Sequence, residues 1–142
     1  MPQNFSRIVG NEDQLYAISA EITKSLHPGD IVLLEGPLGA GKTTFVRGIL
    51  HDLGYQDIVR SPTFNLIQTF ETKPPIMHAD LYRVESAVGI GLEDYLETHV
   101  CLIEWGERAK GWINADDAWK VKIEFSSRGR LVQVTAPKNP FF

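Results

Sequence analysis

The chain has 142 residues, 43% of them hydrophobic, which suits one domain around one core and leaves too little chain for two. Its net charge of −4 argues against a broad basic face for nucleic acid, so we expect any contact with RNA to go through a partner. The single cysteine, Cys101, lies in an apolar run and cannot form an internal disulfide. No apolar run approaches the ~20 residues that cross a bilayer, and the first residues lack the apolar centre of a signal peptide. We therefore expect a cytoplasmic protein without contact to a membrane.

The first predicted element is a helix that starts after Asn11 and ends before the Pro28-Gly29 pair. Asn11 and Gln14 resemble a capping pair. The apolar residues of this segment share one helical face, namely Leu15, Ile18, Ile22 and Leu26. An apolar strand over 30–35 follows, then a glycine-rich loop and a second helix that reaches about Asp52.

The glycine-rich loop from Gly36 to Thr43 reads G-x-x-x-x-G-K-[ST] between a strand and a helix. This is the order that a phosphate-binding loop requires, with glycines that let backbone N–H groups converge on one anion. The helix that starts near Lys42 adds the positive end of its dipole. Lys42 is then expected to reach the β- and γ-phosphates, and the Thr43 hydroxyl to bind magnesium. The alternative is a simple glycine turn before a core helix.

Short strands are predicted at 57–60, 65–71 and 76–82, the last two forming a hairpin through the turn-forming "TKPP". The segment 85–99 is typical of a helix interrupted at Gly89 and Gly91. A fully buried strand at 100–105 follows. In 119–125 apolar and polar residues alternate, and with 131–136 this segment predicts a closing antiparallel hairpin.

These elements predict a single α/β domain over 1–142, with a disordered tail over 137–142. Its architecture is expected to be a three-layer, P-loop NTPase-like fold with a central mixed sheet and an antiparallel edge hairpin.

Five further residues are candidates for chemistry. Glu104 ends a buried strand, where a phosphate-loop protein places its second magnesium carboxylate, although a carboxylate there can also mark where a strand reaches water. His78 and Asp80 share one face of an extended strand and are candidates to orient a water or the metal's outer shell. A lone histidine can equally be a structural hydrogen-bonding group. Ser61 and Thr63 flank a proline, and indicate either a segment that senses the γ-phosphate or a tight turn.

The choice of base follows from an absent motif. The N-K-x-D tetrad that reads guanine in GTP-binding proteins occurs nowhere in the chain. ATP is therefore the expected nucleotide.

Four segments, "GPLGAGKTTFVRGIL", "SPTFNLIQTF", "HADLYR" and "LIEWGE", occur here in the order and spacing that resemble the TsaE (YjeE) family, small bacterial ATPases of the tRNA threonylcarbamoyladenosine pathway. The similarity runs from the first helix to the final hairpin. It implies an ATPase that is slow alone and works with the proteins TsaB and TsaD, meeting tRNA indirectly, and whose ATP hydrolysis resets that complex between catalytic cycles. Its cofactors would be ATP or ADP with Mg²⁺.

The resemblance also implies roles for single residues. Thr43 and Glu104 would bind magnesium, and Asp80 would be the catalytic or water-orienting carboxylate, acting with Glu104 and Lys42. The residues expected at the nucleotide are Asn11, Gly39, Ala40, Gly41, Lys42, Thr43, Thr44, Ser61, Thr63 and either Arg128 or Arg130 of the last hairpin.

Two other functions remain open. The phosphate loop also suits a small-molecule or nucleotide kinase, although the segment 56–100 offers only two arginines, Arg60 and Arg83, for a lid. The second is a non-catalytic module that holds a nucleotide as a structural ligand.

Overall fold

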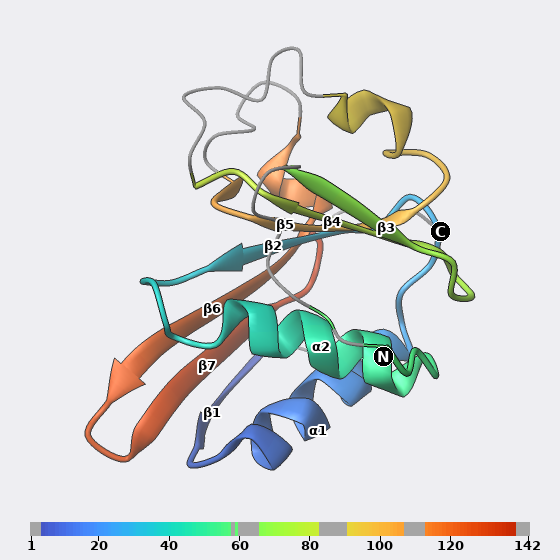
Figure 1. Cartoon of the computed structure of the whole chain (residues 1–142). Coiled ribbons are helices and arrows are strands. Elements are labelled where there is room, and N and C mark those ends of the chain that lie inside the picture. Colours follow the sequence, from blue (N-terminus) through green and yellow to red (C-terminus); the bar gives the residue numbers. More distant parts are fainter. Residues whose placement is uncertain (1–3, 58, 60–65, 83–90, 107–112, 139–142) are drawn as a thin grey trace.

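The computed structural model describes residues 4–57, 59, 66–82, 91–106 and 113–138 (Figure 1). Two α-helices and seven strands make up most of this part of the chain. The helices are α1 (Glu12–Thr23) and α2 (Lys42–Asp52). The strands are β1 (Phe5–Val9), β2 (Ile31–Glu35), β3 (Ile67–Phe70), β4 (Ile76–Asp80), β5 (Val100–Glu104), β6 (Trp119–Ser126) and β7 (Gly129–Thr135), with short 3-10 helices η1 (Leu92–Asp94) and η3 (Ala115–Asp117).

All seven strands belong to one mixed sheet in the order β1-β7-β6-β2-β5-β4-β3. The four inner strands β6, β2, β5 and β4 are parallel, while β7, β1 and β3 pair antiparallel with their neighbours. The predicted hairpins β3–β4 and β6–β7 are both confirmed. Strand β1, which the sequence analysis did not predict, adds one more strand outside β7.

Helices α1 and α2 both cover one face of this sheet (Figure 1). The main core lies between them and the sheet, because alternate residues of each inner strand point towards the helices, as Val32 and Leu34 of β2 do. The opposite face carries a smaller apolar cluster with η1 packed on it, made of Leu33, Met77, Ala79, Leu81, Leu92, Cys101, Ile103 and Ala118. The predicted layered α/β fold with a central mixed sheet is thus confirmed, and in the described part of the chain the outer layer on this second face is a 3-10 helix.

The start of α1 follows the predicted capping pair. The Asn11 side chain accepts a hydrogen bond from the Gln14 N–H at 2.9 Å, and the Gln14 side chain accepts one from the Gly10 N–H at 2.6 Å. Two backbone donors at the helix start are therefore satisfied, which fixes the direction in which the chain leaves β1.

Other predictions are corrected. The strand predicted at 57–60 is wrong at Asp57 and Val59, neither of which is in a strand; the Val59 carbonyl instead accepts a bond from the Arg47 side chain at 3.2 Å. Of the helix predicted over 85–99, residues 85–90 lie outside the described residues, and 91–99 form η1 and turns rather than an α-helix. The disordered tail over 137–142 stays a prediction, because 139–142 lie outside the described residues; within it, the Lys138 N–H donates to the Asp116 carbonyl at 2.8 Å.

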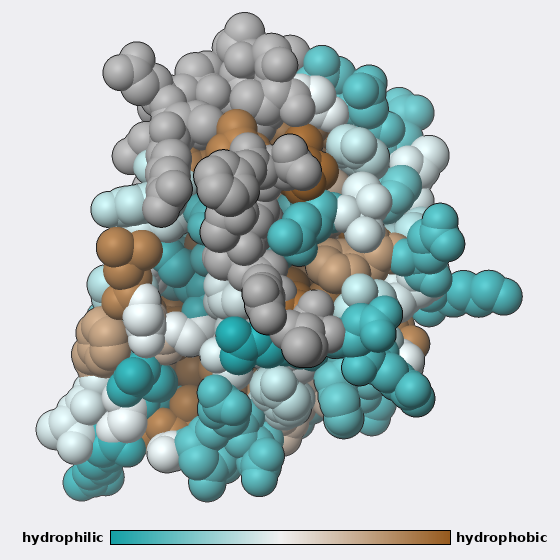
Figure 2. Space-filling view, in the orientation of Figure 1, coloured by the Kyte–Doolittle hydropathy of each residue, from teal (hydrophilic) through white to brown (hydrophobic). Residues whose placement is uncertain are grey.

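The outer sides of the two helices are polar. In Figure 2, hydrophilic residues predominate over the region of α1 and α2, as expected for amphipathic helices that bury one face. Of the helices in the described part of the chain, none combines the length and the apolar character that crossing a membrane requires.

Candidate functional site

The glycine-rich loop lies between the carboxyl end of the central strand β2 and the amino end of α2. Gly41 is the N-cap of α2 and has φ of 123°, and no side chain among the described residues caps the helix. The first turn of α2 contains no acidic residue. The positive end of the helix dipole is therefore directed at the loop without a carboxylate of its own helix to offset it.

Lys42 places a buried positive charge beside this loop. The residue is only 5% exposed, and its Nζ donates a hydrogen bond to the Gly36 carbonyl at 2.6 Å. The same Nζ lies 4.1 Å from the centroid of the Trp105 ring, a cation–π distance. Trp105 comes directly after β5 and adopts a φ of 61°, so the chain turns sharply where the aromatic ring meets Lys42. The ammonium is thus held close to the loop by a carbonyl and an aromatic face.

The acidic candidates come from two neighbouring parallel strands. Asp80 of β4 and Glu104 of β5 are register partners at the carboxyl ends of their strands. The Thr43 hydroxyl donates to Glu104 Oε2 at 3.4 Å. A pocket of about 280 Å³ brings these groups together and is lined by Leu38, Gly39, Gly41, Lys42, Thr43, Thr44, Asp80, Glu104 and Trp105. The cation, the hydroxyl and both carboxylates predicted from sequence therefore meet in one cavity.

His78 lies below this pocket and does not line it. Its side chain is fully buried on β4, and its Nε2 is 2.6 Å from Glu104 Oε2. His78 and Asp80 both belong to β4 and are two residues apart, so they lie on the same face of the strand, as predicted. Of the two, however, only Asp80 reaches the cavity, while His78 contacts the carboxylate of the next strand.

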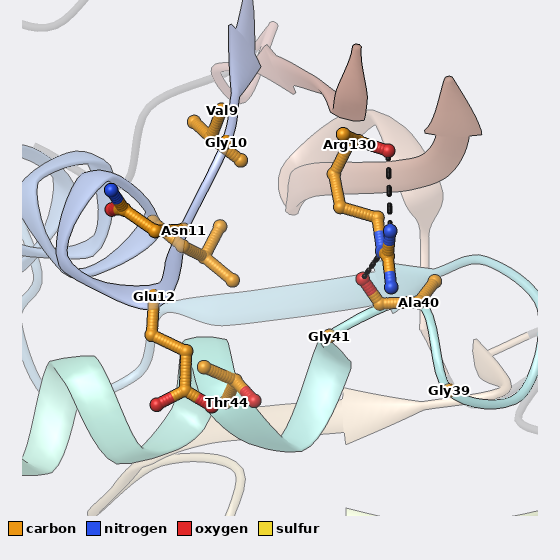
Figure 3. Close-up of a pocket in the computed structure, with 11 residues that line it drawn as sticks. Val9, Gly10, Asn11, Glu12, Gly39, Ala40, Gly41, Thr44 and Arg130 are labelled. Atoms are coloured by element: carbon orange, nitrogen blue, oxygen red, sulfur yellow. Dashed lines mark hydrogen bonds between the residues drawn. The ribbon is translucent and has the colours of Figure 1, made fainter. Parts of the chain in front are cut away.

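A second pocket, of about 240 Å³, lies on the other side of the loop (Figure 3). Asn11, Glu12 and Thr44 line it from the starts of the two helices, and Arg130 of β7 borders it on the side of the loop residue Ala40. The Arg130 Nε donates to the Ala40 carbonyl at 3.1 Å, and its guanidinium stacks 4.4 Å from the centre of the Phe125 ring. Arg130 therefore connects the closing hairpin to the glycine-rich loop through a hydrogen bond.

The predicted residues divide between these two pockets. Both pockets are lined by Gly39, Gly41 and Thr44. The first pocket is also lined by Lys42, Thr43, Asp80 and Glu104, and the second by Asn11 and Ala40. Arg128 is exposed in the β6–β7 turn and lines neither, whereas Arg130, its stated alternative, lines the second. Ser61, Thr63 and Arg83 lie outside the described residues.

Trp105 and Glu12 are among the pocket residues that sequence reasoning missed. Trp105 follows a buried strand directly, but only its backbone turn brings the ring over Lys42. Glu12 is the first residue of α1 and gives the ordinary signal of an acidic helix start.

The donor set suits a hard cation. Thr43 and Glu104 supply a hydroxyl and a carboxylate oxygen within 3.4 Å of each other, and Mg²⁺ prefers oxygen ligands. The described residues contain no cluster of three or more His, Cys, Asp or Glu suited to a metal. Magnesium commonly takes only one or two protein oxygens and completes its shell with water and substrate phosphate, so the two groups fit that ion.

A central parallel strand that leads through a glycine-rich loop into a helix, beside two acidic strand ends, defines an α/β domain with a P-loop NTPase-like fold. The family model described as "Threonylcarbamoyl adenosine biosynthesis protein TsaE" matches residues 9–132. The chain belongs to this TsaE family.

Individual relatives agree with this assignment. The chain is 38% identical over 127 residues to the tRNA threonylcarbamoyladenosine biosynthesis protein TsaE of Haemophilus influenzae, covering 84% of this chain and 80% of that protein. It is 45% identical over 108 residues to the TsaE protein of Rickettsia felis, covering 72% of this chain and 63% of the relative. Among solved structures, Bacillus subtilis YdiB superposes with a TM-score of 0.81 at 30% identity, covering 96% of this chain and 88% of that one.

Proposed function

We propose that this protein is the ATP-binding and ATP-hydrolysing component of the machinery that makes tRNA N6-threonylcarbamoyladenosine. Family membership and the names of the relatives support the pathway. In this proposal the protein acts in the cytoplasm with TsaB and TsaD, meets tRNA only through that complex, and resets it between catalytic cycles.

The observation that carries the proposal is the position of Lys42. Its buried ammonium lies at the glycine-rich loop, 2.6 Å from the Gly36 carbonyl, at the amino end of a helix without an acidic first turn. A buried cation, a helix dipole and loop N–H groups together favour a polyphosphate. ATP would exchange the carbonyl and the Trp105 ring for phosphate oxygens around the same Nζ.

Magnesium would be held by Thr43 and Glu104, whose oxygens lie 3.4 Å apart. When bound, the ion neutralises charge that develops on the phosphates. Asp80 lines the same cavity beside Glu104, and its carboxylate would orient the attacking water. The base and sugar would occupy the second pocket between Asn11 and Arg130. Ser61, Thr63 and Arg128 remain predicted neighbours of the nucleotide.

Two alternatives have distinct consequences. A small-molecule kinase would release ADP in proportion to a phosphorylated acceptor, so a metabolite screen with acceptor-dependent ADP release would favour it. A non-catalytic module would bind nucleotide with Asp80 and Glu104 dispensable for turnover, and no partner would raise hydrolysis.

The experiment combines a binding titration with a multiple-turnover assay of purified components. We expect the protein to bind a TsaB–TsaD pair more tightly with ATP than with ADP, since a nucleotide can bias assembly only through such a difference. Asp80→Ala should still assemble with the pair but fail in repeated rounds of tRNA modification. Equal affinities in both nucleotides, together with full activity of Asp80→Ala, would refute the proposal.

A further inference from the structure

His78 is a buried polar residue that the cavity itself does not use. It lies in the middle of β4 with its side chain fully buried, on the same sheet face as Asp80 and as the buried Ile76. Its neighbour in register on β5 is Leu102, and Glu104 is two residues further along the same face. The imidazole therefore lies beneath the acidic strand ends, between them and the core.

The imidazole contacts one polar side chain among the described residues. Its Nε2 contacts Glu104 Oε2 at 2.6 Å, whereas its Nδ1 has no hydrogen-bond partner among the described residues. A buried polar atom without a partner costs free energy, so the Nε2 contact is the polar interaction among the described residues that offsets burial of this imidazole. The tautomer that carries the proton on Nε2 donates this bond to the carboxylate.

Glu104 Oε2 makes two polar contacts of different length. The Thr43 hydroxyl lies at 3.4 Å and the His78 Nε2 at 2.6 Å. The shorter contact is within hydrogen-bond distance, and it comes from a side chain that is fully buried. His78 therefore makes the closer of these two contacts to the carboxylate.

We propose that His78 is a positioning residue for the magnesium site, which orients the Glu104 carboxylate towards Thr43 before nucleotide arrives. This rests on the proposed function, because it assigns Glu104 to Mg²⁺. A glutamate has three side-chain torsions, and the buried imidazole removes part of this freedom in advance. Partners that orient a metal ligand in this way typically change metal affinity by about 10- to 100-fold when they are removed.

Two nearly isosteric variants separate this role from simple filling of the core. His78→Gln keeps an N–H donor at the position of Nε2, whereas His78→Met fills similar space without a donor. The measurement is a Mg²⁺ titration of ADP binding by calorimetry, with a second series in EDTA. Met77→Leu is the matched control, because Met77 is fully buried on the other face of the same strand and belongs to the other apolar cluster.

We expect His78→Met to weaken apparent Mg²⁺ affinity by about tenfold or more, with unchanged ADP affinity in EDTA. His78→Gln and Met77→Leu should stay near the unsubstituted protein. Unchanged Mg²⁺ dependence in a folded His78→Met would overturn the proposal, as would equal losses in the Met and Gln variants. Nucleotide binding by the unsubstituted protein that does not respond to Mg²⁺ would overturn it too.

A second measurement needs no variant at this position. Long-range proton–nitrogen NMR spectra of the ligand-free protein should show His78 with its proton on Nε2, and Glu104→Gln should move that resonance. A proton on Nδ1 instead would overturn the inference even if His78→Met does not fold. Failure of the proposed function has a different signature, because the unsubstituted protein would then bind no ATP or ADP in any buffer.

Discussion

Replacing Gly36 by alanine tests how closely the glycine-rich loop is built against the sheet. Gly36 has φ of 146°, and a Cβ at this position would overlap the carbonyl oxygen of Ile123 on β6. Gly39 provides the comparison, because its φ is 78° but a Cβ there would meet nothing within 4 Å. Both substitutions strain the backbone. Only the alanine at Gly36 also overlaps backbone atoms of another strand.

The expected magnitudes follow from these two contributions. Alanine at a left-handed position such as Gly39 costs about 1–2 kcal/mol of unfolding free energy. At Gly36, strain of about 1–3 kcal/mol and overpacking of about 1–3 kcal/mol combine. The smaller entropy of the unfolded alanine chain offsets about 0.4–1 kcal/mol in both variants. Where the strain at the two positions is similar, the difference between the two variants is the overlap with Ile123, about 1–3 kcal/mol.

The assay is equilibrium urea unfolding of both variants beside the unsubstituted protein, with the slope m compared so that only changes in midpoint are interpreted. We expect Gly36→Ala to unfold at clearly lower urea than Gly39→Ala. Two variants whose unfolding free energies agree within about 0.5 kcal/mol, the usual range for sites without special features, would refute the close packing of Gly36 against β6.

Lys42→Ala should weaken ATP binding by about 10- to 150-fold, the equivalent of a hydrogen bond to a charged group. Thr43→Ala should keep ATP binding and lose turnover. Calorimetry that shows unchanged ATP affinity in Lys42→Ala would contradict the phosphate-loop assignment. Glu104→Gln should bind ATP but hydrolyse it far more slowly, and a normal single-turnover rate would move the second magnesium contact to another residue. Burial raises the pKa of the Cys101 thiol from 9.0 to about 12, so almost no thiolate forms in the folded protein at pH 8, and a thiol-specific reagent should react with Cys101 only after unfolding in urea. Because that pKa is raised by folding, the contribution of Cys101 to stability is fully present below pH 9 and is lost as the pH rises towards about 12; rapid reaction of the native protein at pH 8 would contradict its burial.

The sequence correctly predicted those elements whose pattern of apolar, polar and capping residues lies within the element itself. Patterns within a few neighbouring residues predict the capped amphipathic helix α1, the buried strands β2 and β5, and the alternating hairpin β6–β7. Strand β1 was missed because four of its five residues are exposed or only half-buried, with Val9 alone buried. Its extended conformation depends on pairing with β7, more than a hundred residues further along the chain. The strand predicted around Val59 failed for the converse reason, since its apolar residue packs into the core from irregular backbone.

The candidate site shows the same division. Lys42, Thr43 and Glu104 follow from a local motif and a strand end. The roles of Trp105, Arg130 and His78 depend on contacts between segments far apart in sequence. Trp105 reaches Lys42 through a backbone turn of positive φ, and His78 finds Glu104 only because β4 and β5 are neighbours in register. The order of residues along the chain does not show which distant segments will be in contact.

The position of β6 beside β2 has a consequence for synthesis of the chain. Strand β2 and the glycine-rich loop leave the ribosome early, but their neighbour β6 begins at Trp119, and the bonds that join the loop to Glu104 and Arg130 span 61 and 90 residues. Contacts so distant in sequence form late, because the intervening chain must be ordered first. During translation one side of β2 is thus an unpaired, strongly apolar strand edge, of the kind that favours aggregation in nascent chains. A protein truncated before Trp119 should therefore retain the complete loop motif and yet be a substrate for chaperones rather than a site for phosphate.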